Sequence, residues 1–187
     1  MRSTRSKTAS QASDAVGLVV ALLVRFPEIA TIVSYPNEGT LTLSFAVGTR
    51  LERAAEREVR ESIAEHVGAL TQATGEQLET LAVECERDTR MTFVRVTRDA
   101  RSFSREELQL LTALLAGRFG EALVKSPAVE DDLLEDEIAA ADDLVEFALE
   151  ALRDPTQQRS LVGFREEKRV LVYFVKTRKK AKARARS

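Results

Sequence analysis

Residues 40–47 read TLTLSFAV and alternate large apolar side chains with small ones, which are Thr40, Thr42, Ser44 and Ala46. A period of two is typical of an antiparallel strand with one buried face. The preceding stretch, IATIVSY, is short and β-branched, and PNEG joins the two segments. Proline presets the backbone for a turn, and Gly39 tolerates the left-handed conformation that other residues avoid. We therefore expect a β-hairpin, and with it an antiparallel sheet that other elements cover on one side.

A helix is expected after this hairpin. Thr49 and Glu52 have the spacing of a capping box, in which each side chain pairs with a free backbone amide of the first turn. An apolar stripe at helical spacing then continues to about Thr71 and consists of Val59, Ile63, Val67 and Leu70. His66, the single histidine, lies beside the stripe, where an ordinary hydrogen bond is expected; one histidine lacks the partners of a metal site.

The same pattern of elements follows a second time. QLETLAVECE and MTFVRVT are predicted to be strands around the turn RDTR. Cys85 alternates with charged residues, which indicates a small apolar residue on the inner face of its strand. Ser104 and Glu107 form a second capping box, and Phe103 and Leu108 flank it as a hydrophobic staple. A helix is expected from there to about Val124.

The N-terminal segment is basic and then apolar, as in a signal peptide. Asp14 at the junction, the nearby Arg25 and Pro27, and the lack of a small-x-small cleavage site argue against secretion. The apolar run AVGLVVALLV is too short for a bilayer, which needs about 20 residues. We expect a cytoplasmic protein without a membrane span. Its first helix, from about Ser13 to Phe26, should be buried on more than one side, between the sheet and another helix or in a subunit interface.

A strongly acidic segment precedes the last predicted strands. Residues 130–150 carry ten carboxylates and no cation, but the apolar residues keep helical spacing, which predicts an amphipathic helix with an acidic outer face. These apolar residues are Leu134, Ile138, Ala141, Val145, Leu149 and Leu152. A final hairpin is expected from SLVGF, the charged turn REEKR and VLVYFV.

The predicted fold class is α+β, an antiparallel sheet in α-ββ-α-ββ-α order with helices packed on it, plus a C-terminal acidic helix and β-hairpin. The predicted organisation is a disordered basic leader at 1–12, a core domain at 13–125, an appendage of acidic helix and hairpin at 126–175, and a disordered basic tail at 176–187. In element order, residues 13–124 resemble roadblock/longin-type and GAF-type domains, which implies a ligand-binding or protein-interaction module. The resemblance rests on topology and implies no site residues.

The residue types of common catalytic sites are scarce. Gly117 and Gly120 lie within a helical segment rather than in a phosphate-binding loop, and no cluster of cysteine and histidine suggests a metal ligand set. No serine lies in a nucleophile elbow. The acidic segment lacks the spacing of a calcium loop. We predict that the protein is not an enzyme and assign it no cofactor, catalytic residue or metal ligand.

The C-terminal tail is the candidate binding segment. It carries seven cations and no carboxylate after the last strand, namely Lys176, Arg178, Lys179, Lys180, Lys182, Arg184 and Arg186. No aromatic residue is interleaved, so the tail predicts phosphate contact without base readout, with strong salt dependence. Docking onto the protein's own acidic helix, or no specific role at all, is together an equally weighted alternative, and other anionic partners are a further one.

The sequence thus predicts a non-catalytic, cytoplasmic interaction or regulatory module that associates with a protein partner or with itself, in a homodimer for example. Its tail would add weak affinity for polyanions. One alternative is an RNA- or DNA-binding protein, ribosome-associated for example, with a basic face on the folded domain that includes Arg90, Arg95, Arg98, Arg101 and Arg105. The other is a small-ligand sensor or enzyme with a pocket between sheet and helices.

Overall fold

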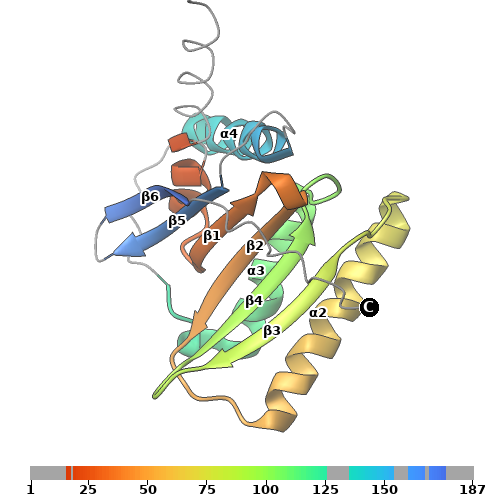
Figure 1. Ribbon diagram of the computed structural model, residues 1–187, viewed down its shortest axis with the longest axis vertical. Coiled ribbons are helices and arrows are strands. Elements are labelled where there is room, and N and C mark those ends of the chain that lie inside the picture. The colour runs from red at the N-terminus through yellow and green to blue at the C-terminus, as the bar shows by residue number, and fades with distance from the viewer. Residues whose placement is uncertain (1–15, 18, 126–134, 154–159, 167–168, 176–187) are drawn as a thin grey trace, which may run out of the picture.

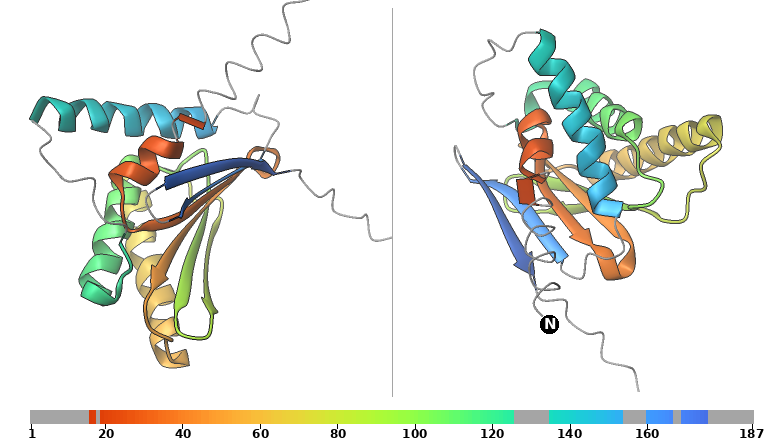
Figure 2. Two further views of the ribbon diagram at one scale, coloured as in Figure 1. Left: turned by 90° about the vertical axis from the view of Figure 1, so that its left-hand side faces the viewer. Right: turned by 90° about the horizontal axis from the view of Figure 1, so that it is seen from above.

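Figure 1 shows the computed structural model of the 187-residue chain, which describes residues 16–17, 19–125, 135–153, 160–166 and 169–175. Its centre is one antiparallel sheet of six strands in the order β3-β4-β2-β1-β5-β6. Four helical segments pack against this sheet (Figure 2). The predicted α+β class and the order of its elements are confirmed.

The strands follow the two-residue periodicity of the sequence. They are β1 (Ile29–Tyr35), β2 (Thr40–Val47), β3 (Leu81–Arg87), β4 (Thr92–Asp99), β5 (Ser160–Glu166) and β6 (Arg169–Val175). The predicted hairpin joins β1 to β2 through a short 3₁₀ turn, η1 (Pro36–Glu38), and Gly39 closes it at a φ of 63°. Glycine adopts this left-handed conformation without the steric cost of a Cβ atom.

The register of the sheet gathers its apolar side chains on one face. Ile32 of β1 pairs with Leu43 of β2, which pairs with Val96 of β4, which pairs with Val83 of β3. The first three of these are at most 2 % exposed and belong to one core that also includes helix residues. The helices therefore cover this face, and the opposite face carries polar residues such as Thr42 and Thr97, whose hydroxyls lie 2.9 Å apart.

The helices are a first segment (residues 16–17 and 19–25), α2 (Arg53–Thr74), α3 (Arg105–Phe119) and α4 (Glu135–Arg153). A 3₁₀ turn, η2 (Gly120–Ala122), follows α3. α2 and α3 lie side by side along the strands β2, β4 and β3, and α4 crosses above the first helix (Figures 1 and 2). In α4 the core residues are Val145, Ala148, Leu149 and Leu152, which confirms the predicted apolar stripe over the positions that are described.

The first helix lies directly on β5. Val19, Leu22 and Leu23 are at most 1 % exposed. A Cβ atom added at Gly163 of β5 would lie 2.3 Å from Cγ1 of Val19 and 3.2 Å from Cδ1 of Leu23, so only a glycine allows this approach. The helix is thus enclosed between the sheet and α4, as one of the two sequence interpretations expected (Figure 2).

The C-terminal hairpin is part of the central sheet. β5 pairs antiparallel with β1 from Thr31↔Phe164 to Ser34↔Leu161, and β6 extends the sheet by one more strand. Leu161 is 1 % exposed, and α4 shares the core of the other helices. The segment predicted as an appendage, 126–175, therefore supplies a third of the strands and one covering helix in the residues that are described.

The two predicted capping boxes have different outcomes. At α3 the hydroxyl of Ser104 accepts a hydrogen bond from the amide of Glu107 at 3.2 Å, and the flanking Phe103 and Leu108 are both 1 % exposed. At α2 the predicted box is wrong, because the helix begins only at Arg53 and its N-cap residue makes no side-chain capping bond.

Thr92 explains the later start of α2. Its hydroxyl accepts from the amide of Leu51 at 2.9 Å and donates to the carbonyl of Thr49 at 3.1 Å. The preceding segment is thereby held against β4 in a non-helical conformation. The end of α3 also differs from the prediction: the helix stops at Phe119, where Gly120 has a φ of 51°, rather than at Val124.

No helix among the described residues is both long enough and apolar enough to cross a bilayer. The predicted leader 1–12 and tail 176–187 lie outside the described residues.

Candidate functional site

The seven cations predicted to bind polyanions, Lys176 to Arg186, lie outside the described residues. The arginines of the alternative nucleic-acid surface are described, and the fold separates them. Arg90 precedes β4 and Arg101 follows it, so the two lie at opposite ends of that strand. Arg95 is paired with Glu86 on the face of the sheet without helices, and Arg98 is buried. Arg105 is the first residue of α3, soon after Arg101, so the five arginines together do not form one shared basic face.

Arg98 instead lies at the centre of a buried polar network. Its Nε and Nη2 donate to the two oxygens of Glu107 at 2.6 and 3.0 Å, and its Nη1 donates to the carbonyl of Thr80 at 2.7 Å. Asp99 and Ser102 accept its remaining N–H groups. These contacts join the start of β3, the end of β4 and the first turn of α3, which is a role in the fold rather than at a surface.

Histidine and cysteine are the residue types most often reactive in other sites, and the chain has one of each. His66 is exposed, and its Nδ1 lies 2.7 Å from the carbonyl oxygen of Ser62, as a boundary histidine should. Cys85 is half-buried on β3, and burial raises the pKa of its thiol. In the described part of the chain no three histidine, cysteine, aspartate or glutamate side chains group in a way that could hold a metal ion.

The first surface of interest is β6, the last strand of the sheet. Its sequence RVLVYFV is apolar on both faces, and Tyr173, Phe174 and Val175 are 53, 40 and 40 % exposed. Tyr173 stacks on Phe164 of β5 with ring centroids 5.8 Å apart. We call Leu171, Tyr173, Phe174 and Val175 the β6 surface.

The backbone of β6 adds hydrogen-bonding groups to this surface. Among the described residues β6 pairs only with β5, so it forms an edge of the sheet. Every second residue of an antiparallel edge strand directs its amide and carbonyl away from its neighbour. An edge that is both apolar and open is a template for another strand, and stable proteins normally cover or charge it.

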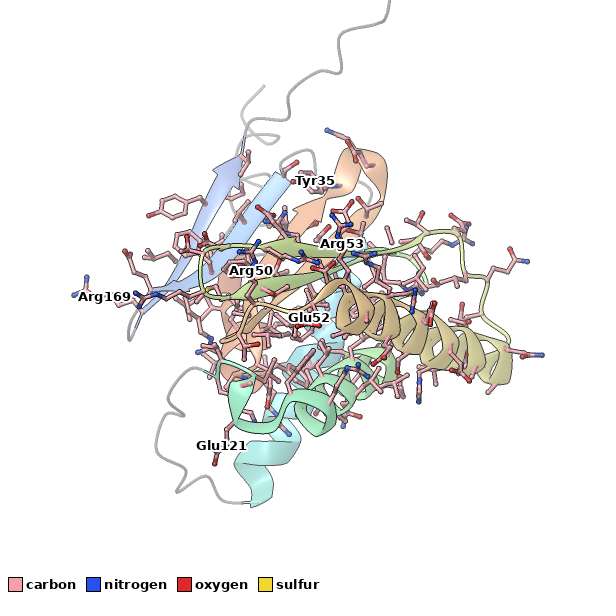
Figure 3. All side chains as sticks on the ribbon, turned by 90° about the horizontal axis from the view of Figure 1, so that it is seen from below. Tyr35, Arg50, Glu52, Arg53, Glu121 and Arg169 are labelled. Carbon is pink, nitrogen blue, oxygen red and sulfur yellow. The ribbon has the colours of Figure 1, made fainter. Side chains whose placement is uncertain are left out.

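The second surface is an open pocket of about 540 Å³ where the first turns of α2 meet the end of β3. We call it the arginine pocket, and its lining residues are Arg53, Glu56, Arg57, Arg60, Cys85 and Arg87. Arg53 is the first residue of α2 and is visible at the start of that helix in Figure 3. Arg169, on β6, lies across the sheet from it (Figure 3).

A single buried carboxylate holds two of these arginines. Glu56 is 7 % exposed and accepts from Nε of Arg87 and from Nη2 of Arg60, the latter at 3.3 Å. The hydrogen bond from Arg87 is the largest cause that lowers the pKa of Glu56, and it also raises the pKa of Arg87. Both groups are therefore held in their charged forms.

One residue of the sequence, Glu56, indicated this pocket, but it lies within the apolar stripe of α2 and was overlooked there. The buried positions of α2 are Glu56, Val59, Ile63, Val67 and Thr71, so the stripe begins with a carboxylate. A buried glutamate in the apolar stripe of a helix requires a cationic partner, and Arg60, itself 45 % exposed, follows Glu56 by one helical turn. The distant partner, Arg87, was not deducible from spacing, since it comes from another element.

Comparisons of the chain with protein families, with characterised proteins and with solved structures give no match. The resemblance to roadblock/longin-type and GAF-type domains thus gains no support from them, and the functional conclusion depends on the two surfaces.

Proposed function

We propose that this protein is a non-catalytic interaction module that associates with a second copy of itself through β6. The single observation that carries the proposal is the exposed apolar edge strand, with Tyr173 53 % exposed. Pairing two such strands covers the apolar side chains and satisfies the outward amides and carbonyls together. A second copy offers the same strand, so the interface is of the isologous type that two-fold dimers use.

The residue sequence of β6 is self-complementary in an antiparallel register. With Val172 on the two-fold axis, Leu171 lies opposite Tyr173 of the second strand and Val170 lies opposite Phe174. Arg169 then lies opposite Val175, so no like charges of the described strand meet. Cross-strand apolar and aromatic pairs of this kind contribute roughly 0.2–1 kcal/mol each. The two sheets would join into one continuous sheet.

Oligomeric state as a function of concentration tests the proposal. Light scattering coupled to gel filtration should show a dimer of the 20.7 kDa chain. Tyr173→Lys should shift the equilibrium to monomer, because it places an ammonium in an apolar strand pair. Phe147→Lys is the matched control, since Phe147 is 61 % exposed on a different element, α4, and this variant should remain dimeric.

Two results would contradict self-association. One is a wild-type chain that stays monomeric up to about 100 µM, a concentration at which even a weak dimer with a Kd in the micromolar range forms. The other is a Tyr173→Lys variant that folds, by circular dichroism, and dimerises like the wild type. A monomer that instead binds extended apolar peptides would assign β6 to a different protein partner.

The basic tail is proposed to give additional, sequence-independent affinity for polyanions. This proposal rests on its seven cations, from Lys176 to Arg186, which follow β6 directly in the sequence. In the antiparallel dimer the two tails start at opposite ends of the joined strands. Binding of a single-stranded oligonucleotide by the full chain should fall steeply with salt, and a chain that ends at Val175 should lose it. Equal, salt-insensitive binding by both chains would eliminate this role.

A further inference from the structure

Beyond self-association, we infer that the arginine pocket binds a small oligophosphate, a ligand with two or more linked phosphoryl groups. Four guanidinium groups line it, those of Arg53, Arg57, Arg60 and Arg87. They come from one face of the start of α2 and from the last residue of β3. The fold therefore assembles in one place cations that are as many as 34 residues apart in the sequence.

The charge within the pocket is not balanced by its own carboxylate. Glu56 accepts hydrogen bonds from Arg87 and Arg60. Its interaction with Arg53 is electrostatic only, without a hydrogen bond. Arg57 has a marginal pair with Glu61, at 3.9 Å, between side chains 70 and 69 % exposed. Such exposed pairs contribute little. Four cations against one lining carboxylate leave a surplus of positive charge whose mutual repulsion an anion would relieve.

The start of α2 adds to this field. Arg53 is the first residue of the helix, and the free amides and the dipole of a first helical turn favour an anion. Acidic residues normally occupy this region of a helix, and here Arg53 and Arg57 are added to Glu56. Glu56 holds the guanidinium of Arg87 through a partly buried hydrogen bond, so part of the site is organised before a ligand arrives.

The chemistry of the lining selects the ligand class. The planar guanidinium fork matches two oxygens of a phosphoryl group, and several forks match several such groups. The volume of about 540 Å³ lies in the range of small-molecule sites, roughly 300–1,000 Å³. No aromatic ring lines the pocket, so it offers no surface on which a nucleobase would stack. An oligophosphate fits this combination better than a nucleotide base does.

The test uses the full chain with inorganic diphosphate and tripolyphosphate in titration calorimetry at about 0.15 M salt. We expect one site per chain. The double variant Arg53→Gln/Arg57→Gln should bind about tenfold more weakly or worse, because it removes charge-assisted hydrogen bonds while the Glu56 contacts stay intact. The matched control is Arg101→Gln, which removes an exposed cation at the opposite end of β4 and should keep the wild-type affinity.

Cys85 supplies an independent readout, because it lines the pocket and is the single cysteine of the chain. Bound tripolyphosphate should slow the reaction of its thiol with a disulfide reagent in the wild type, and much less in Arg53→Gln/Arg57→Gln. Dimer dissociation by Tyr173→Lys should leave both readouts unchanged, which separates this site from the β6 surface.

Three outcomes would overturn the inference. One is equal affinity of the wild type and the double variant for tripolyphosphate. The second is an equal response to sulfate, which would show a general anion surface rather than an oligophosphate site. The third is a double variant that loses binding of a thymidine oligonucleotide while the wild type binds neither diphosphate nor tripolyphosphate, which would assign the pocket to a nucleic-acid backbone.

Discussion

The guanidinium of Arg98 and the carboxylate of Glu107 form a two-point ion pair in the interior, with each side chain 1 % exposed. All five N–H groups of Arg98 have acceptors, in Glu107, Thr80, Asp99 and Ser102. Arg98 and Glu107 belong to β4 and α3, so the pair fixes the start of a helix against the end of a strand. Breaking such a pair leaves a charge without compensation, which is more costly than the pair is favourable.

The first prediction concerns this pair. Glu107→Gln should lower the free energy of unfolding by about 3 kcal/mol, because Arg98 then keeps a buried charge with only Asp99 beside it. Glu86→Gln is the matched control: it breaks the pair with Arg95, whose side chains are 43 and 57 % exposed, and should cost less than about 1 kcal/mol. Urea unfolding of both variants measures the difference. Equal losses would show that Arg98 and Glu107 are not coupled as the geometry indicates.

Most of the sheet was predictable because local sequence determines it. The alternation of residues 40–47 and the PNEG turn specify a hairpin without reference to the rest of the chain. Ser104 and Phe103 likewise determine the start of α3 from adjacent residues. The start of α2 was not predictable in this way, because Thr92, from a strand 41 positions after Leu51, holds the segment before it. Contacts between distant elements override local capping signals.

The candidate sites show the same difference between local sequence signals and contacts between distant elements. Arg95 and Arg98 were predicted to lie on one candidate basic face, although their spacing of three residues puts them on opposite faces of a strand. Burial by α3 converts Arg98 into a structural residue. The arginine pocket was missed because Arg87 and Arg53 meet only after β3 and α2 have packed together. Charge clustering between elements leaves no periodic signal.

The second prediction concerns the contact between β5 and the first helix. Gly163→Ala should lower the free energy of unfolding by about 1–3 kcal/mol, since its Cβ would lie 2.3 Å from Cγ1 of the fully buried Val19. Gly68→Ala, in α2, has no atom within 4 Å of the added Cβ and should instead raise stability by roughly 0.5–1 kcal/mol. Chemical denaturation measures both.

A double variant tests the cause of the first effect. Val19→Ala removes the opposing methyl groups, so adding it to Gly163→Ala should cost less than the sum of the two single changes. Strict additivity would contradict a direct contact between the helix and β5.

The third prediction is a pH dependence that involves Glu56. The hydrogen bond from Arg87 holds its pKa below the ordinary value of 4.5, so the folded state binds this proton less well than the unfolded chain. The stabilisation is fully present above that ordinary value and is lost as the pH falls through the lower, folded pKa. Glu56→Gln should therefore be less stable than the wild type at pH 7, and the difference should shrink below about pH 4.5.

Glu58→Gln is the control for this pH series. Glu58 lies two residues away on α2, its side chain is 60 % exposed, and its pair with Arg118 is on the surface. The change should alter stability little at either pH. A difference between Glu56→Gln and wild type that is the same at pH 7 and pH 4 would rule out the ionised carboxylate as its source.

The last prediction concerns Arg165 of β5, whose buried Nε and Nη2 have no hydrogen-bond partner among the residues that the structure describes. Burial lowers the pKa of its guanidinium. The charge of Glu28 acts in the opposite direction by electrostatic attraction, without a hydrogen bond. Donors deprived of both water and an acceptor oppose folding, whereas an apolar side chain of similar length does not. Arg165→Met should accordingly raise the free energy of unfolding by up to about 1 kcal/mol. Arg169→Met, at the exposed start of β6, is the control and should have no such effect on unfolding in urea. Destabilisation by Arg165→Met would show that the attraction of Glu28 and the packing of the side chain outweigh the two unsatisfied donors.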